Sequence, residues 1–187
     1  MRITGGVSKG RQLSALRGHK IRPSSERVRE AIFNIIGQDL ADINVLDLFA
    51  GSGILGIEAL SRGAAGSLFI DRSQQSVGLI RKNLTLCGFE KSGAVLKRDL
   101  SRGLPWKHEM MRRKFGLVFI DPPYGKKMIT PILDDLWGKN FLDTPAIVVA
   151  ESSKCDTLPE TFGAIHLALM RIYGETKLTV YHYGVEQ

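Results

Sequence analysis

The stretch Asp47-Leu48-Phe49-Ala50-Gly51-Ser52-Gly53-Ile54-Leu55-Gly56 decides the fold. The apolar run 43–48 before it is typical of a buried strand, and residues 54–61 after it are typical of a helix. The three glycines therefore form a G-x-G-x-x-G pattern between a strand and a helix. Glycines at these positions let the backbone turn sharply and lie against a nucleotide ligand. A second possibility, a glycine turn that only allows close helix packing, stays open at this point.

Strand and helix patterns alternate on both sides of this loop. Helices are predicted at 23–36, 54–61, 74–87 and 129–137, and strands at 43–48, 67–70, 93–96, 115–120 and 146–150. Ser73 and Gly88 predict the ends of the third helix. The tail differs, because residues 164–170 and 177–183 flank a turn with no helix between them. The sequence predicts a doubly wound, mostly parallel α/β sheet with a C-terminal antiparallel hairpin.

Positive charge is concentrated at the N-terminal end. The chain carries a net charge of +7, and residues 1–30 contain eight Lys or Arg against two Glu. Residues 1–22 are predicted to form a basic β-hairpin extension, followed by one domain over residues 23–187. The basic end is either a phosphate-binding surface or a solvated one.

Other features of the composition exclude several classes of protein. No apolar run is long enough to span a bilayer, and the N-terminal residues 1–6 lack the apolar region of a secretory signal, so none is expected. Cys87 and Cys155 lie far apart and outside any C-x-x-C pair, which favours reduced thiols in a cytoplasmic protein. The four histidines share no metal-ligand spacing, so no metal site is predicted.

Acidic residues at strand ends indicate which ligand the loop binds. Asp47 would repel the pyrophosphate of a dinucleotide but would attract the positive charges of S-adenosylmethionine, so we favour the latter over NAD. Asp71 ends the next strand, where a carboxylate can accept hydrogen bonds from ribose hydroxyls. Asp99 follows the third strand and is either a partner for the adenine amino group or a helix N-cap.

The segment Asp121-Pro122-Pro123-Tyr124 follows the fourth strand, at the edge where open α/β sheets bind ligands. The two prolines stiffen an extended backbone. Asp121 and the carbonyl of Pro122 can then accept the two N–H bonds of an exocyclic amino group, while the Tyr124 ring stacks on the base. A rigid turn before the next helix is the alternative explanation.

Together these motifs resemble the RsmD family, bacterial methyltransferases that modify the exocyclic N2 amino group of a guanine in 16S ribosomal RNA. The resemblance rests on R-I-T-G-G-x-x-K-G-R, I-R-P-S-S-E-R-V-R-E-A-I-F-N, D-L-F-A-G-S-G-I-L-G-I-E-A-L-S-R-G-A, D-P-P-Y and Y-G-E-T. It implies the seven-stranded, Rossmann-like sheet of class I methyltransferases.

The resemblance also implies roles for individual residues. S-adenosylmethionine would be held by Asp47, Phe49, Ala50, Gly51, Ser52, Gly53, Asp71, Arg72 and Asp99. The reaction pocket would be formed by Asp121, Pro122, Pro123 and Tyr124. RNA would be bound by Lys9, Arg11, Arg22, Arg27, Arg29 and Lys126. For Arg27 and Arg29, ion pairs with Glu26 and Glu30 on the same helix are the alternative.

Two further functions remain open from the sequence. The same D-P-P-Y segment serves DNA adenine-N6 methyltransferases, and a non-catalytic RNA-binding protein with a vestigial cofactor site is a third interpretation. The expected partner is ribosomal RNA, within a 30S subunit or an assembly intermediate, and the expected state is a monomer. A short chain has little surface for independent sequence readout.

Overall fold

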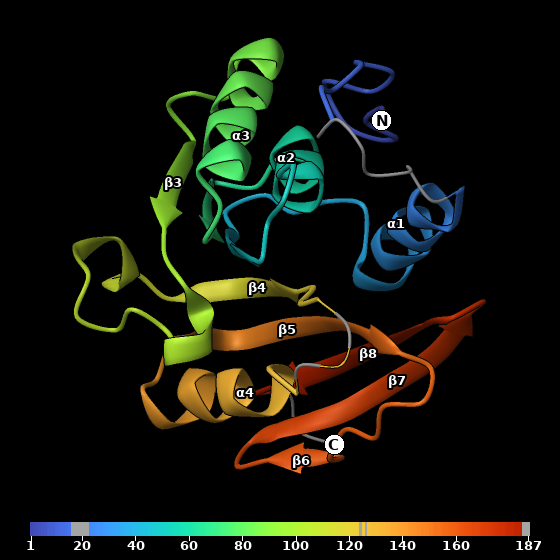
Figure 1. Cartoon of the computed structure of the whole chain (residues 1–187), viewed down its shortest axis with the longest axis vertical. Coiled ribbons are helices and arrows are strands. Elements are labelled where there is room, and N and C mark those ends of the chain that lie inside the picture. Colours follow the sequence, from blue (N-terminus) through green and yellow to red (C-terminus); the bar gives the residue numbers. More distant parts are fainter. Residues whose placement is uncertain (16–22, 124, 126, 185–187) are drawn as a thin grey trace.

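The computed structural model describes residues 1–15, 23–123, 125 and 127–184. Its strands form one eight-stranded sheet in the order β3-β2-β1-β4-β5-β8-β7-β6 (Figure 1). The helices are α1 (Pro23–Ile36), α2 (Ile54–Ser61), α3 (Gln74–Cys87) and α4 (Ile129–Gly138), with short 3₁₀ turns η1 (Leu100–Arg102) and η2 (Glu109–Met111). The strands are β1 (Asn44–Leu48), β2 (Gly66–Asp71), β3 (Gly93–Lys97), β4 (Phe115–Ile120), β5 (Leu142–Ser153), β6 (Thr161–Phe162), β7 (Ile165–Tyr173) and β8 (Thr176–Tyr183).

The predicted fold class is confirmed. Strands β1 to β5 pair in parallel, and β8 joins β5 antiparallel. The C-terminal hairpin is present as β7 and β8, with Tyr173 opposite Thr176 beside the turn. One strand more than the predicted seven is present, because the two-residue β6 adds to the outer edge of β7.

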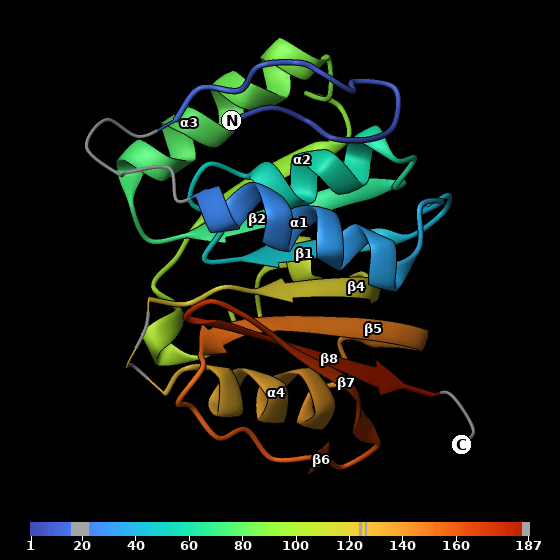
Figure 2. The same cartoon turned by 90° about the vertical axis from the view of Figure 1, so that its right-hand side faces the viewer.

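Two apolar layers hold the sheet. On one face, α1, α2 and α3 pack against alternate residues of β1 and β4, such as Val45, Leu117 and Phe119. On the other face, α4 and the 3₁₀ turns cover the intervening residues, such as Leu46 and Val118. Figure 2 shows α1 and α2 on the same face of the sheet, and the Phe33 ring of α1 packs edge-on against Phe119 of β4. Because successive residues of a strand point to opposite faces, a parallel strand buried on both sides must be apolar throughout.

Local capping fixes α3 where the sequence predicts it. The Ser73 hydroxyl accepts a hydrogen bond from Ser76 N at 3.3 Å, and Gly88 ends the helix in the left-handed conformation at φ 75°. At the N-terminal end of α3, the Ser73 side chain satisfies a backbone N–H that has no partner within the helix. At the C-terminal end, the left-handed conformation costs little because the residue is a glycine. None of the described helices combines the length and apolarity needed to cross a bilayer.

The N-terminal segment, residues 1–15, lies along α2 and α3 (Figure 2). Of the predicted hairpin extension over residues 1–22, the structure describes residues 1–15, in which one antiparallel bridge joins Arg2 and Gln12. The Ile3 side chain is buried in the core of the α1–α3 face. Gly6 has φ +72°, and a Cβ atom there would overlap the backbone carbonyl of Ser61 on α2. The segment is therefore packed as part of the domain core and not as a detached arm.

Candidate active site

The ends of three neighbouring strands meet at the carboxyl edge of the sheet. Leu48 of β1 is in register with Ile120 of β4, and Ile120 with Ala150 of β5. The backbone N–H of Asp121 donates to the Leu48 carbonyl at 3.4 Å. The strand order reverses between β1 and β4, which makes this edge the switch point where open α/β sheets bind ligands. The glycine loop and the D-P-P segment leave the sheet side by side.

The glycine loop has a tightly constrained backbone. Phe49, Gly51 and Gly53 have positive φ values of 60°, 56° and 76°, and Phe49 is a non-glycine residue in this region. Gly53 N donates to Ala50 O at 2.7 Å, which closes the turn before α2 begins. A Cβ atom on Gly56 would overlap the Phe69 ring. The glycines therefore serve both the turn and the close packing of α2 on β2, and a left-handed non-glycine residue is typical of ligand-binding loops.

Asp71 fastens this loop to the end of β2. Its carboxylate accepts hydrogen bonds from Gly51 N at 2.9 Å and from Ser73 N at 2.8 Å. The side chain is partly exposed, and its neighbour Arg72 is exposed. A carboxylate has about four lone-pair positions, so two remain for hydroxyl donors of a ligand. Asp71 thus fixes the loop and still presents an acceptor beside it.

Asp47 lies beneath the loop and not on its surface. The residue is 2% exposed, and one carboxylate oxygen accepts a hydrogen bond from Gly56 N at 2.9 Å. Burial raises the pKa of Asp47 well above its usual range; the Gly56 hydrogen bond opposes the rise, and the charges of Asp121 and Asp71 add to it. A bound cation would offset this cost of ionisation, so the site favours a positively charged ligand.

Replacing Asp47 by Asn should stabilise the ligand-free protein at alkaline pH. Below the pKa of the unfolded state, Asp47 is protonated in both states and has no effect. As the pH rises above that value, the unfolded chain ionises first while the raised pKa keeps the folded form protonated, so the free energy of unfolding falls. Asp47→Asn keeps an acceptor for Gly56 N without the charge.

Thermal unfolding from acid to alkaline pH tests this expectation. The melting temperature of Asp47→Asn should exceed that of the wild type at pH 8 by about 2–4 °C for each kcal/mol recovered. The two proteins should converge in acid. A variant that melts lower than the wild type at pH 8 would show that the buried charge stabilises the fold.

Glu151 is a residue of this site that was not predicted from the sequence. It lies two residues after Val149, as Asp121 lies two residues after Phe119, so strand alternation directs both toward the face that holds Asp47. Burial raises the pKa of Glu151 well above its usual range, and the charges of Asp121 and Asp47 raise it further. A signal was present, since Glu151 directly follows the apolar run 146–150, just as Asp121 directly follows the run 115–120.

The D-P-P segment begins at this cluster of acids. Asp121 and Pro123 are exposed at the edge, whereas Pro122 between them is buried. The Asp121 charge contributes to the raised pKa of both Asp47 and Glu151. Tyr124, the fourth predicted residue of the pocket, lies outside the described residues. The structure therefore brings Asp47, Asp121 and Glu151 together at one edge of the sheet, and Asp121 is the most exposed of the three.

Asp99 has the structure of an N-cap. Its carboxylate accepts a hydrogen bond from Ser101 N at 3.0 Å at the start of η1, and its side chain is exposed. The Ser101 backbone N–H lowers the pKa of Asp99, with smaller contributions from the Ser101 side chain and from Arg72 and Arg102. The capping alternative is therefore realised, and a contact with adenine stays a prediction.

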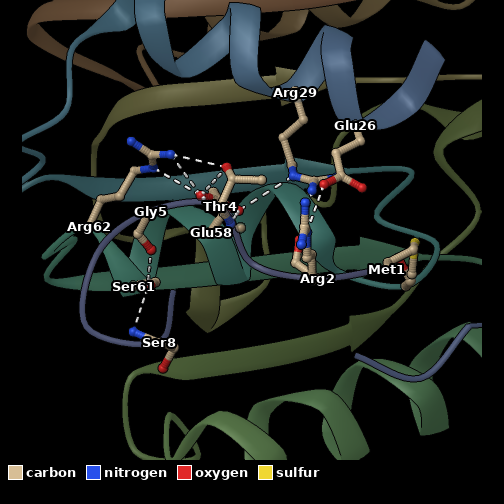
Figure 3. A network of polar contacts seen from close by, with 12 residues as sticks. Met1, Arg2, Thr4, Gly5, Ser8, Glu26, Arg29, Glu58, Ser61 and Arg62 are labelled. Atoms are coloured by element: carbon tan, nitrogen blue, oxygen red, sulfur yellow. Dashed lines mark hydrogen bonds and ion pairs between the residues drawn. The ribbon is translucent and has the colours of Figure 1, made fainter. Parts of the chain in front are cut away.

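The basic residues predicted to bind RNA divide into three groups. Lys9, Arg11 and Arg27 are exposed, whereas Arg22 and Lys126 lie outside the described residues. The prediction for Arg29 is wrong, because this side chain is buried at 3% exposure. Its Nε lies 3.4 Å from Glu58 on α2, and its Nη2 donates to Arg2 O at 2.8 Å (Figure 3). Helical spacing suggested partners on α1 itself and could not reveal a partner on another helix.

These side chains fit S-adenosylmethionine better than a dinucleotide. Asp47, Asp71 and Glu151 place three carboxyl groups at the edge that carries the glycine loop. Such a set attracts a sulfonium and an ammonium group and repels a pyrophosphate. In the part of the chain that the structure describes, no group of three or more His, Cys, Asp or Glu is arranged to hold a metal ion.

Comparison with known proteins identifies the family. The family described as Conserved hypothetical protein 95 matches residues 1–182. The Bacillus subtilis (strain 168) protein YlbH is 37% identical over 183 residues, which cover 97% of this chain and 98% of YlbH. Ribosomal RNA small subunit methyltransferase D of Escherichia coli (strain K12) is 30% identical over 97% of this chain and 89% of its own length. The solved structure of Escherichia coli yhhF superposes with a TM-score of 0.82 at 28% identity and covers 100% of this chain and 99% of that one. The chain therefore belongs to the Conserved hypothetical protein 95 family, as its resemblance to the RsmD methyltransferases predicted.

Proposed function

We propose that this protein transfers the methyl group of S-adenosylmethionine to the exocyclic N2 amino group of a guanine in small-subunit ribosomal RNA. The observation that carries the proposal is the shared carboxyl edge of β1 and β4. There the Leu48–Ile120 register places the glycine loop directly beside Asp121 and the two prolines. The name of the Escherichia coli relative, a ribosomal RNA small subunit methyltransferase, agrees with this chemistry.

Each part of the edge has a role in binding the methyl donor. The glycine loop and Asp71 would hold the nucleoside, with Asp71 accepting from ribose hydroxyls. Asp47 and Glu151 would face the positive charges of the donor. Burial disfavours the ionised form of both carboxyl groups, and a positive charge nearby would favour it again. When bound, S-adenosylmethionine supplies an activated methyl group on a positively charged sulfur, which becomes a neutral thioether on transfer.

Asp121 would act on the acceptor amine. Its carboxylate can accept one amino N–H while the stiff Pro122-Pro123 backbone keeps the acceptor in place. The lone pair of this nitrogen is otherwise delocalised into the ring of the base. The hydrogen bond to Asp121 draws electron density toward the nitrogen. Once the new N–C bond has formed, the nitrogen carries an extra proton that it must lose. Burial and the charges of Asp121 and Asp47 raise the pKa of Glu151, so Glu151 would be a group at this edge able to accept that proton.

The RNA would approach along the basic N-terminal side. Lys9, Arg11 and Arg27 are exposed there and can contact phosphates, which position the substrate without reading its sequence. We include an assembled or assembling 30S subunit as the substrate, because the basic surface of one short chain gives little sequence readout. A monomer suffices for this arrangement.

Identification of the methylated nucleoside tests the proposal. Purified protein and labelled S-adenosylmethionine would be incubated with 30S subunits from a strain that lacks the enzyme, or with duplex DNA. We expect label in N2-methylguanosine from the subunits and no label in the DNA. Label in N6-methyladenine of DNA would establish the alternative activity. Donor binding without transfer to either substrate would favour a non-catalytic RNA-binding role.

A further inference from the structure

One side chain links the glycine loop to the N-terminal segment. Asn83 lies on α3 with 0% exposure. Its Nδ2 donates to Ser52 O at 2.9 Å, within the glycine loop, and to Ser14 O at 3.1 Å, in the N-terminal segment. Its Oδ1 accepts from Ser14 N at 2.9 Å. Both amide hydrogens are therefore used, and they join two segments that are distant in the sequence.

A buried carboxamide of this kind tolerates little displacement. Breaking any hydrogen bond of a buried polar group costs free energy, because no water replaces the lost partner. All three contacts therefore favour one arrangement. Asn83 cannot keep its two donor bonds if either Ser52 or Ser14 moves away. The positions of the two backbones are therefore correlated through a single rigid group.

A second contact joins the same two segments. The Ser52 hydroxyl lies 3.8 Å from the Met1 sulfur, within reach of a weak hydrogen bond. The N-terminal segment is internally connected, since Leu13 N donates to Met1 O at 2.8 Å and Ile3 N to Arg11 O at 3.0 Å. A shift at Ser14 is thus transmitted to the part of the N-terminal segment that carries Lys9 and Arg11, whose side chains are exposed.

We propose that Asn83 is a positioning residue that couples binding of the methyl donor at the glycine loop to binding of RNA on the N-terminal segment. The inference rests on the proposed function, which assigns these two ligands to the two segments. A donor that fixes the Ser52 backbone also fixes Asn83 and hence Ser14, and RNA that fixes the N-terminal segment acts in the reverse direction. Coupling of this kind is reciprocal, so each ligand strengthens the binding of the other by the same factor.

Equilibrium dialysis measures this factor directly. The Kd of labelled S-adenosylhomocysteine, which cannot react, would be determined with the protein alone and with saturating 30S subunits from a strain that lacks the enzyme. Subunits without the protein give the background. For the wild type we expect the Kd to fall by about fivefold or more when subunits are present, the lower end of typical coupling factors.

Two variants of Asn83 and one control separate coupling from folding. Asn83→Ala removes all three contacts, and Asn83→Leu removes them while keeping a side chain of similar size. In each, the ratio of the two Kd values should fall to about one, while thermal melting verifies that the protein is folded. Asn34→Ala, at an exposed position on α1, should keep the wild-type ratio. If Asn83→Ala does not fold, Asn83→Leu, which leaves a smaller void, carries the same test.

The outcomes distinguish this inference from the proposed function. A wild-type protein that methylates subunits but has a Kd ratio of one overturns the coupling and leaves the activity intact. An unchanged ratio in folded Asn83→Leu shows that the coupling does not pass through Asn83. Absence of methyl transfer by the wild type contradicts the proposed function, whatever the dialysis shows.

Discussion

Asp121→Ala should lower kcat for methyl transfer by about 10²–10³-fold, the loss typical of removing one group that is oriented toward the reacting atoms. The affinity for S-adenosylmethionine should stay within about threefold of the wild type, because the loop contacts of Asp71 and Asp47 do not depend on Asp121. Single-turnover transfer to 30S subunits measures the loss of rate in the methyl-transfer step, and calorimetry measures the affinity for S-adenosylmethionine.

Asp134→Ala is the matched control for this variant. Asp134 is an exposed acid on α4, which packs on the opposite face of the sheet from α1–α3, so its removal changes the net charge equally. It should leave both quantities unchanged. If Asp121→Ala turns over at the wild-type rate, the Asp121 carboxylate has no part in the reaction. If the variant loses both donor binding and turnover, Asp121 acts in binding the cofactor.

Glu58→Ala should destabilise the folded protein strongly. Glu58 is 0% exposed and lies 3.4 Å from Arg29 and 2.8 Å from Arg62 (Figure 3). Its carboxylate also accepts from the Thr4 backbone N–H at 2.9 Å. Removing it leaves two guanidinium groups buried without their counter-charge, which typically costs about 3–5 kcal/mol.

Thermal and urea unfolding measure this loss. With about 2–4 °C per kcal/mol for a domain of this size, the melting temperature should fall by about 6–20 °C. Glu175→Ala is the control, since Glu175 forms an ion pair with Lys154 at 2.7 Å but its side chain is 73% exposed. An exposed pair of this kind contributes about 0–1 kcal/mol. Equal effects of the two substitutions would mean that the Glu58 network does not support the fold.

Most of the fold could be predicted because local signals and tertiary packing agree. The helices at 54–61 and 74–87 have the predicted bounds, since a glycine turn, the Ser73 cap and Gly88 define their ends within the sequence itself. The strand at 115–120 is apolar throughout and is buried between two helical layers. By contrast, β5 extends from Leu142 to Ser153, well beyond the apolar run 146–150, because its polar C-terminal end continues to pair with β8.

The active site could be predicted where a residue's role depends on its position along a strand, and not where it depends on packing. Asp47, Asp71 and Asp121 lie at the ends of parallel strands and therefore meet at one edge. Arg29 resembles its exposed neighbour Arg27 in sequence, but it turns inward to Glu58, which lies on a helix 29 residues away in sequence. Neither helical periodicity nor charge density contains that information.

Glu151 was missed for a different reason: its sequence signal was present but was not used. Its signal, an acid just after an apolar run, was as strong as that of Asp121, but the fifth strand was expected to end at residue 150 and was given no role in the site. The strand order places β5 next to β4, so the acid after its apolar run reaches the same edge as Asp121. Its importance follows from topology, which the order of elements along the chain does not fix.

Binding of the methyl donor at the carboxyl edge of β1, with its methyl group presented to Asp121, is the central requirement of the proposed reaction. A crystal structure of the protein with S-adenosylmethionine tests it most directly. We predict that the ribose lies against Asp71, that the glycine loop lies along the nucleoside, and that the methyl group faces the Asp121–Pro123 segment. A donor bound away from the glycine loop, or bound there with its methyl group turned from Asp121, would contradict this prediction.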